Sequence, residues 1–138
     1  MAWSLHHVNL PAHDVRAMVA FYSNVFGMQE IPFPFPSKGR GVLETGSDFV
    51  ALFQDHNGRQ IHICKPTQSL SWDNNLRLHP VINGHFAIEV DDLDEVGNRL
   101  RAAGVPFDDA GRWAMQGYRQ LYCYDPSMNV VEINQKID

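Results

Sequence analysis

The stretch "GHFAIEV" at residues 84–90 places a polar residue, His85, near the head of an apolar run of strand length. An earlier stretch, "HHVNL" at residues 6–10, has the same character. When His7 is aligned with His85, apolar residues recur 8, 11 and 15 positions later in both copies, which is the spacing of one helix face. The matching pairs are Val15 with Leu93, Met18 with Val96, and Tyr22 with Leu100. The sequence therefore predicts two copies of one strand–helix unit.

The ends of both predicted helices carry matching signals. Asp14 and Asp92 precede the first apolar residue of each helix and are expected to be N-caps, and Glu95 completes a capping box with Asp92. Gly27 and Gly104 follow the helices, where glycine readily adopts the left-handed conformation of a C-cap. Agreement through strand, loop, helix and stop supports a genuine internal repeat.

Short apolar runs after each helix predict further strands. They lie at 29–33, 41–45, 49–54 and 59–65 in the first half, and at 105–109, 119–125 and 129–135 in the second. An Asn-Gly pair just before the run at 59–65 is a strong hairpin signal. We therefore expect an α+β chain of two βαβββ modules, the first at 1–65 and the second at 85–138, joined by a linker at 66–84 that is rich in Pro, Asn and Ser.

Composition and charge narrow the classes of function. The chain has 138 residues, a formal net charge of −5 and no run of lysine or arginine. We therefore expect one domain that binds neither nucleic acid nor an anionic membrane surface. No apolar stretch approaches the roughly 18 residues of a membrane span, and "MAWSLHHVNL" does not have the pattern of a signal peptide. With Cys64 and Cys123 expected to be free buried thiols, a cytoplasmic enzyme or small-molecule-binding protein is the expectation.

Four polar residues stand inside otherwise apolar strand-like runs. His7 lies in the opening run of the first unit and His62 in its closing run, and His85 and Glu132 hold the corresponding places in the second unit. A twofold packing of the units would bring the four together. Imidazole and carboxylate ligands suit one borderline divalent cation, Zn, Ni, Fe, Co or Mn. Glu132 is the strongest indication, because a buried carboxylate needs a charge partner or a metal.

With these residues in place, the chain resembles the vicinal oxygen chelate superfamily, which contains glyoxalase I, fosfomycin-resistance proteins, extradiol dioxygenases, methylmalonyl-CoA epimerase and bleomycin-binding proteins. The motifs that carry the resemblance are "HHVNL", "FYSNVFGM", "GHFAIEVDDLDEV", "LRAAGV" and "YDPSMNVVEI". The resemblance implies paired modules that curve into a half-open barrel around one metal, and a homodimer. The modules would pair within one chain or swap between two subunits.

The resemblance also assigns the ligands. First and last strands supply them in the family, which maps onto His7, His62, His85 and Glu132. His7 is chosen over His6 because the family's ligand directly precedes the apolar residue, and His6 is expected to point to the opposite face of its strand.

Two positions depart from the family pattern. Glyoxalase I usually carries a glutamate where this chain has His62, and that carboxylate is thought to share in proton transfer. The turn before the last ligand is commonly Asp-Pro-x-Gly-Asn in the family, whereas "DPSMN" puts Met128 in place of the glycine.

The leading functional expectation is a glyoxalase-like lyase or isomerase acting on a small oxygen-chelating substrate, with a thiol as a possible co-substrate. The cation would stabilise an enediolate as a Lewis acid, and Glu132 would be the catalytic base. The predicted substrate-binding residues are Trp113, Tyr118, Arg119 and Tyr122.

Three alternatives remain open. An Fe(II) extradiol dioxygenase uses two histidines and a carboxylate, so one histidine would stand aside, and such enzymes are commonly longer. Thiol or water addition to an epoxide, as in fosfomycin resistance, would need a cationic lining from Arg119, Lys65 or Arg40. A drug- or metabolite-binding protein is the non-enzyme alternative, against which the four ligands argue.

Overall fold

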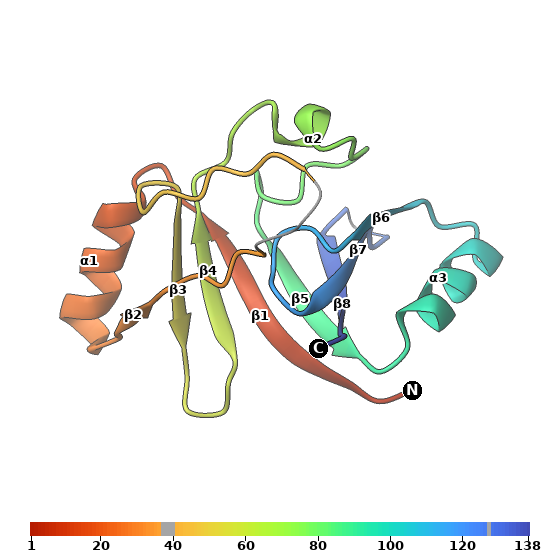
Figure 1. Ribbon diagram of the computed structural model, residues 1–138, viewed down its shortest axis with the longest axis horizontal. Helices are drawn as coiled ribbons and strands as arrows, with labels where there is room; N and C mark the ends of the chain where they lie inside the picture. The colour runs from red at the N-terminus through yellow and green to blue at the C-terminus, as the bar shows by residue number, and fades with distance from the viewer. Residues whose placement is uncertain (37–40, 127) are drawn as a thin grey trace.

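The structure is a computed structural model that describes residues 1–36, 41–126 and 128–138. Its strands form one eight-stranded sheet in the order β2-β3-β4-β1-β5-β8-β7-β6 (Figure 1). The first half contributes β1 (Trp3–Pro11), α1 (Val15–Phe26), β2 (Glu30–Ile31), β3 (Val50–Gln54) and β4 (Gln60–Cys64). The second half contributes β5 (His85–Val90), α3 (Leu93–Ala102), β6 (Phe107–Gly111), β7 (Tyr118–Tyr124) and β8 (Val130–Lys136), with α2 (Leu70–Asp73) between the halves. None of the described helices is long and apolar enough to cross a membrane.

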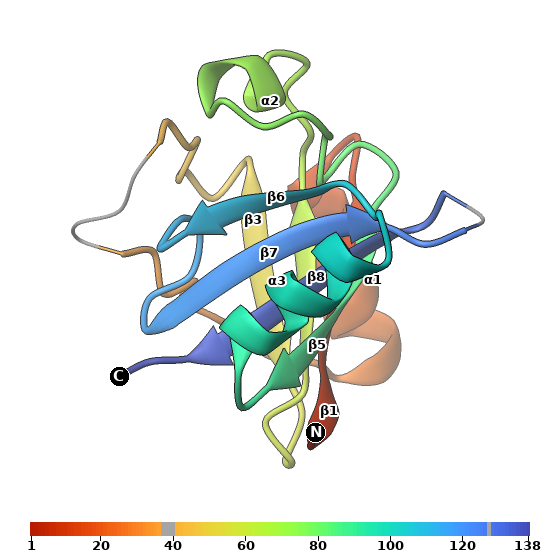
Figure 2. The ribbon, with the colours of Figure 1, turned by 90° about the vertical axis from the view of Figure 1, so that its right-hand side faces the viewer.

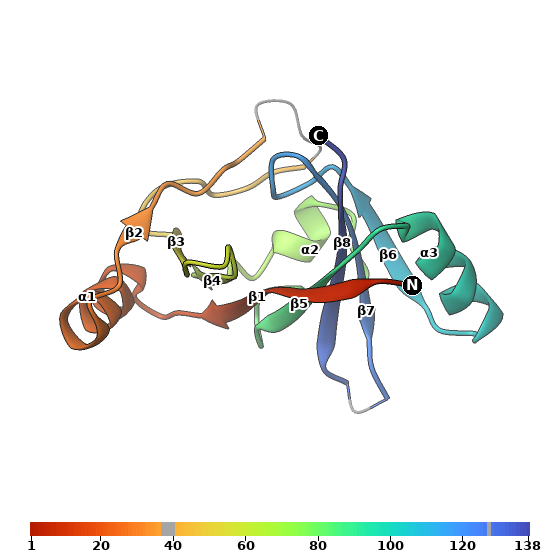
Figure 3. The same ribbon diagram turned by 90° about the horizontal axis from the view of Figure 1, so that it is seen from below.

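The two halves repeat the same arrangement of strands. In each, the closing strand runs parallel to the opening strand, β4 beside β1 and β8 beside β5. The halves join within one chain through the antiparallel pair β1–β5 at the centre of the sheet. The sheet curves around this seam, with α1 and α3 at its two flanks (Figure 3). The α+β fold of two βαβββ modules in a half-open barrel is confirmed.

Successive side chains of a strand point to opposite faces of the sheet. Here one face is covered by the helices and the other is concave. In the first module, Val15 of α1 shares one apolar cluster with Ala51 and Phe53 of β3 and Ile63 of β4. In the second module, Leu93 of α3 shares one apolar cluster with Leu121 and Cys123 of β7 and Ile133 of β8. The intervening residues therefore point to the concave face, and among them are His62, Tyr122 and Glu132, all buried.

The predicted N-caps and the glycines after the helices act as expected, but Glu95 does not complete a capping box, because its carboxylate accepts from Arg99 instead. The Asp14 carboxylate accepts a hydrogen bond from the amide of Ala17, and Asp92 accepts one from Glu95. Gly27 ends α1 in the left-handed conformation with φ 68°, and Gly104, just beyond α3, has φ 69°. Both helices therefore begin and end where the capping residues set them.

The predicted strand at 41–45 is wrong. The segment pairs with no strand, because Val42 uses its backbone groups elsewhere: its amide donates to Oδ1 of Asn74 and its carbonyl accepts from Nδ2 of the same side chain. Asn74 belongs to the segment at 66–84, which holds more structure than a linker. This segment carries α2 at one end of the sheet (Figure 2) and buries Leu70, Leu76 and Leu78.

The two module-closing hairpins have matching hydrogen bonds. In the first, the amide of Asp55 donates to the carbonyl of Arg59, and the amide of Gly58 donates to the carbonyl of Asp55. In the second, Asp125, Met128 and Asn129 make the same bonds. Gly58 has φ 81° and Met128 φ 67°, so Met128 takes a left-handed conformation that favours glycine.

Candidate metal centre and its cavity

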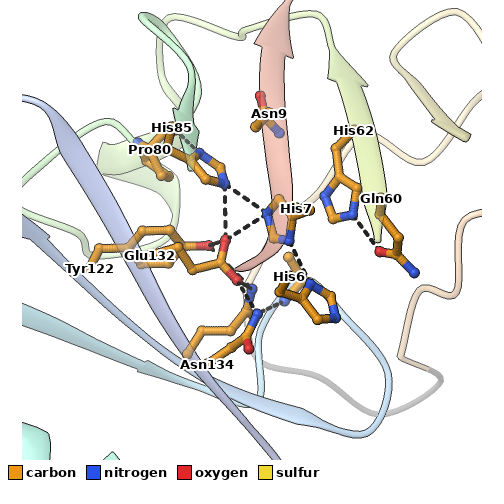
Figure 4. A network of polar contacts seen from close by, with 12 residues as sticks. His6, His7, Asn9, Gln60, His62, Pro80, His85, Tyr122, Glu132 and Asn134 are labelled. Carbon is orange, nitrogen blue, oxygen red and sulfur yellow. Dashed lines mark hydrogen bonds and ion pairs between the residues drawn. The ribbon is translucent and has the colours of Figure 1, made fainter. Parts of the chain in front are cut away.

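Three of the four predicted ligands converge at the centre of the concave face. His7 comes from β1, His85 from β5 and Glu132 from β8, and their ligand atoms all lie within 4.8 Å of one another. Nε2 of His7 is 3.1 Å from Nε2 of His85, and these nitrogens lie 3.2 and 2.9 Å from Oε2 of Glu132 (Figure 4). The side chains are 1%, 4% and 2% exposed, in the same order. Both modules therefore contribute to one buried cluster.

The donor set fits a divalent cation. The Pro80 carbonyl, 2.6 Å away, can only accept a hydrogen bond, so Nδ1 of His85 carries a proton and Nε2 is the nitrogen that a cation could use. Ligands at about 2.1 Å from a zinc ion stand about 3.0 Å apart at right angles and about 3.4 Å apart in a tetrahedron. The observed separations of 2.9 to 3.2 Å fall in and near this range. The cluster could hold one cation and leave positions open for substrate oxygens.

The carboxylate of Glu132 is held by donors from the second module. Oε1 accepts from Nδ2 of Asn134 at 3.2 Å and from Nε2 of Gln120 at 3.0 Å, and Oε2 accepts from the hydroxyl of Tyr122 at 3.2 Å. Burial opposes ionisation of Glu132, but the charges and hydrogen bonds of His7 and His85 outweigh it and hold the pKa well below its usual range. The buried carboxylate is therefore ionised and fixed in orientation.

His62 does not join the cluster. Its ring stacks on that of His7, with centroids 3.7 Å apart, and its Nε2 donates to Oε1 of Gln60 at 2.8 Å. Burial, with a smaller effect of His7, lowers the pKa of His62 well below its usual value, so the ring is neutral. His62 lines the cavity described below, and its role as the fourth ligand stays a prediction.

The expected orientation of His6 is wrong. Instead of facing the opposite side of β1, its Nδ1 lies 2.8 Å from Nδ1 of His7, and the residue is 8% exposed. The cause is a β-bulge between Leu5 and His7, which interrupts the alternation of the strand. Only the doubled histidine of "HHVNL" hinted at this neighbour, because a bulge has no period-two signal.

The cluster opens on a cavity of about 80 Å³. His62, His85 and Glu132 lie in its wall. The rest of the described lining is largely apolar and includes Phe33, Phe35, Phe49, Leu70, Trp113 and Met115. Both modules and the segment at 66–84 contribute to it. An apolar substrate body therefore fits beside the polar cluster.

The predicted substrate-binding residues divide between this cavity and other places. Trp113 and Tyr122 line the cavity. Tyr118 contacts His6 instead, with ring centroids 5.0 Å apart. Arg119 is not among the lining residues: it pairs with Asp94 of α3 at 3.2 Å and with Asp109 of β6 at 3.5 Å, and its contact with substrate stays a prediction.

The cationic side chains that an epoxide phosphonate substrate would need are only partly present in the described lining of the cavity. Of the three cations expected to supply it, Lys65 lines the cavity and Arg119 is engaged on the outer face. Arg40 lies outside the described residues.

A curved sheet of paired βαβββ modules with a histidine–carboxylate cluster on its concave face defines a class of proteins. Residues 4–133 match the model of the Glyoxalase/Bleomycin resistance protein/Dioxygenase superfamily, and the chain belongs to that superfamily. The resemblance found in the sequence is thereby confirmed. A comparison with curated proteins finds no significant match.

Solved structures share the fold at low sequence identity. Methylmalonyl-CoA epimerase from Mycobacterium tuberculosis has a TM-score of 0.65 and 20% identity, over 97% of this chain and 88% of that chain. A variant of the Streptomyces coelicolor methylmalonyl-CoA epimerase in complex with 2-nitronate-propionyl-CoA has a TM-score of 0.65 and 20% identity, over 97% of both chains. Hypothetical protein BH1468 from Bacillus halodurans has a TM-score of 0.65 and 15% identity, over 100% of this chain and 97% of that chain. These likenesses establish the fold.

Proposed function

We propose that the protein is a divalent-metal-dependent isomerase or lyase that moves a proton on a small oxygen-chelating substrate. His7, His85 and Glu132 would hold the cation. When bound, the cation would stabilise the negative charge of an enediolate as a Lewis acid. The observation that carries the proposal is the convergence of two imidazole nitrogens and one ionised carboxylate beside a largely apolar cavity.

The cavity supports a substrate with an apolar body. Its described wall is built mainly from aromatic and aliphatic side chains, and its polar groups include His85 and Glu132 of the cluster as well as Glu44 and Lys65. Burial of apolar substrate area contributes about 25 cal/mol per Å², while the open metal positions would fix the oxygens. We therefore place the oxygens at His85 and Glu132, and the remainder of the substrate against residues such as Phe33 and Trp113.

Two groups of this chain can accept the substrate proton. The Glu132 carboxylate is ionised, but its orientation is fixed by Gln120, Tyr122 and Asn134. His62 is neutral and lines the cavity, and by the resemblance to glyoxalase I it stands where that enzyme usually carries a glutamate with a share in proton transfer. Since Nε2 of His62 donates to Gln60, the lone pair of its ring lies on Nδ1. We assign metal binding and proton transfer to Glu132, and assistance in proton transfer to His62.

Deuterium exchange tests this function even though the natural substrate is unidentified. Protein prepared without chelator is assayed for bound metal, stripped, and reloaded separately with Zn²⁺, Ni²⁺, Co²⁺, Mn²⁺ or Fe²⁺. Each form is incubated in D₂O with a hemithioacetal or an apolar 2-hydroxy ketone, and NMR follows the carbon-bound proton. We expect metal-dependent exchange that Glu132→Gln abolishes. A folded protein that binds no divalent metal would contradict the proposal and favour a metal-free binding protein.

One observation favours a second candidate, an Fe(II) extradiol dioxygenase. The converged residues are two histidines and one carboxylate, the ligand set of non-haem Fe(II) oxygenases, while the third histidine stands aside. An aromatic-lined cavity also suits a catechol. Anaerobic loading with Fe²⁺ followed by catechol and O₂ separates the candidates. O₂ consumption with ring cleavage supports the dioxygenase, and proton exchange without O₂ consumption supports the isomerase.

A further inference from the structure

We propose that His6 is a positioning residue for the metal centre: its Nδ1 accepts the Nδ1 proton of His7 and so directs the Nε2 lone pair of His7 toward His85 and Glu132. The inference rests on the proposed function, because it concerns the same cation. It assigns a purpose to a residue that is buried beside the cluster without belonging to it.

A local distortion of β1 makes the contact. Adjacent side chains of a regular strand point to opposite faces of the sheet. Here Leu5 pairs with Ile88 and His7 pairs with Ala87, so two positions on β1 advance the register on β5 by one and His6 is the extra residue. The two imidazoles therefore meet edge to face, with centroids 5.1 Å apart and planes at 78°. Bulges of this kind commonly re-aim a side chain at a functional site.

The distances assign the proton between the two rings. Two ring nitrogens 2.8 Å apart form a hydrogen bond only when one carries a proton. A histidine binds a metal through a nitrogen without a proton, and in His7 the nitrogen that faces the cluster is Nε2. The proton of a neutral His7 ligand is then on Nδ1 and is donated to His6. The reverse assignment would put a proton on Nε2, where it would block the metal position.

The chain of hydrogen bonds continues to a carboxylate. Nε2 of His6 then carries a proton and lies 3.3 Å from the hydroxyl of Tyr118, which in turn donates to Oε2 of Glu89 at 3.3 Å. Each donor therefore has an acceptor from His7 to Glu89.

His7 and His85 would both carry a proton on Nδ1 and bind the metal through Nε2, but different groups accept the Nδ1 proton. A metal-ligating histidine commonly donates its second N–H to a carboxylate, a backbone carbonyl or water. For His85 the acceptor is the carbonyl of Pro80. For His7 the acceptor is a second imidazole, available only because of the bulge.

Metal affinity is the first test. His6→Leu removes the acceptor, whereas His6→Asn places an amide oxygen close to the position of Nδ1. His13→Leu, which removes an exposed loop histidine, is the matched control. In a Zn²⁺ competition titration we expect the dissociation constant to rise about 10–100-fold for His6→Leu and by less than about 3-fold for the other two variants.

The second test reads the Nδ1 proton of His7 itself. Long-range ¹H–¹⁵N correlation spectra of the zinc-loaded protein detect this Nδ1–H, because the metal takes the Nε2 lone pair. We expect a downfield, slowly exchanging Nδ1–H signal in the wild type and in His6→Asn, and loss of that shift and of that protection from exchange in His6→Leu. A role of His6 in packing alone would not change this signal.

The outcomes separate this inference from the proposed function. A folded His6→Leu protein with the wild-type zinc affinity and the wild-type Nδ1–H signal of His7 overturns the positioning role and leaves the metal site standing. A wild-type protein that binds no zinc overturns the proposed function instead. If His6→Leu does not fold, His6→Gln replaces it: its amide reaches the Nε2 position and leaves the Nδ1 position empty, so the same loss of affinity is expected.

Discussion

The closing strands of the two modules hold equivalent residues that behave differently. β4 places His62 opposite Asn9, two residues after His7, and β8 places Glu132 opposite Ala87, two residues after His85. The backbone positions correspond, and both residues are buried. Glu132 nevertheless joins the cluster, whereas His62 does not.

The neighbouring strand explains the difference. Tyr122 on β7 pairs directly with Glu132 and donates a hydrogen bond to its carboxylate. The counterpart on β3 is Leu52, which has no polar group to offer His62. His62 instead bonds to Gln60 on its own strand. A repeat thus fixes where a ligand's backbone lies, and the cross-strand partner decides where its side chain points.

The largest expected effect is the loss of metal binding in Glu132→Gln. The substitution replaces the single converged carboxylate by a neutral amide and leaves two imidazoles with no anionic ligand. Elemental analysis of the purified variant should find no bound divalent metal. Glu44→Gln, which alters another cavity-lining carboxylate, should keep the wild-type metal content. Equal metal content in the two variants would remove Glu132 from the site.

The next effect compares the two histidines directly. Because His85 joins the cluster and His62 does not, we expect His85→Ala to weaken zinc binding by more than about 100-fold, beyond the range typical of outer-sphere residues. His62→Ala should weaken it by less than about 10-fold while it slows proton exchange. Calorimetric titration measures the affinities. Losses of equal size would restore His62 as the fourth ligand.

A smaller effect is the contribution of His6 to the pH dependence of stability. The folded-state pKa of His6 is about 4, below its unfolded value, so between these values the unfolded chain binds a proton that the folded chain does not. Stability of the metal-free protein should therefore fall as the pH drops from about 6.5 to about 4, by up to about 3 kcal/mol from this residue. Urea unfolding at a series of pH values measures this. In His6→Asn the loss should be smaller by that amount, and an equal loss in both proteins would be evidence against a buried neutral His6.

The smallest effect tests the equivalence of the two hairpins. Met128 has the left-handed conformation that Gly58 adopts in the first module. Met128→Gly should therefore stabilise the protein by about 1 kcal/mol, and Gly58→Ala should destabilise it by a similar amount. Open space surrounds Gly58, so the expected cost is conformational and not steric. Thermal unfolding measures both changes, and a destabilising Met128→Gly would contradict the account of the turn.

Sequence periodicity predicted the modules and helix ends, because these depend on local spacing and capping. It failed at 41–45, where Val42 gives its backbone hydrogen bonds to the side chain of Asn74. It also could not show that Arg119 pairs with Asp94 of α3 and Asp109 of β6, which are distant in the sequence. It also missed His6, because a bulge breaks the alternation on which a strand prediction depends. The places of His7, His85 and Glu132 followed from the repeat, but the contact of each side chain depended on neighbours distant in the sequence.

Anomalous X-ray diffraction from crystals grown with Zn²⁺ tests the central claim most directly. The account predicts one strong peak at the zinc edge, about 2.0–2.2 Å from Nε2 of His7, Nε2 of His85 and an oxygen of Glu132. A peak elsewhere, or a zinc ion bound by residues of one module alone, would contradict it.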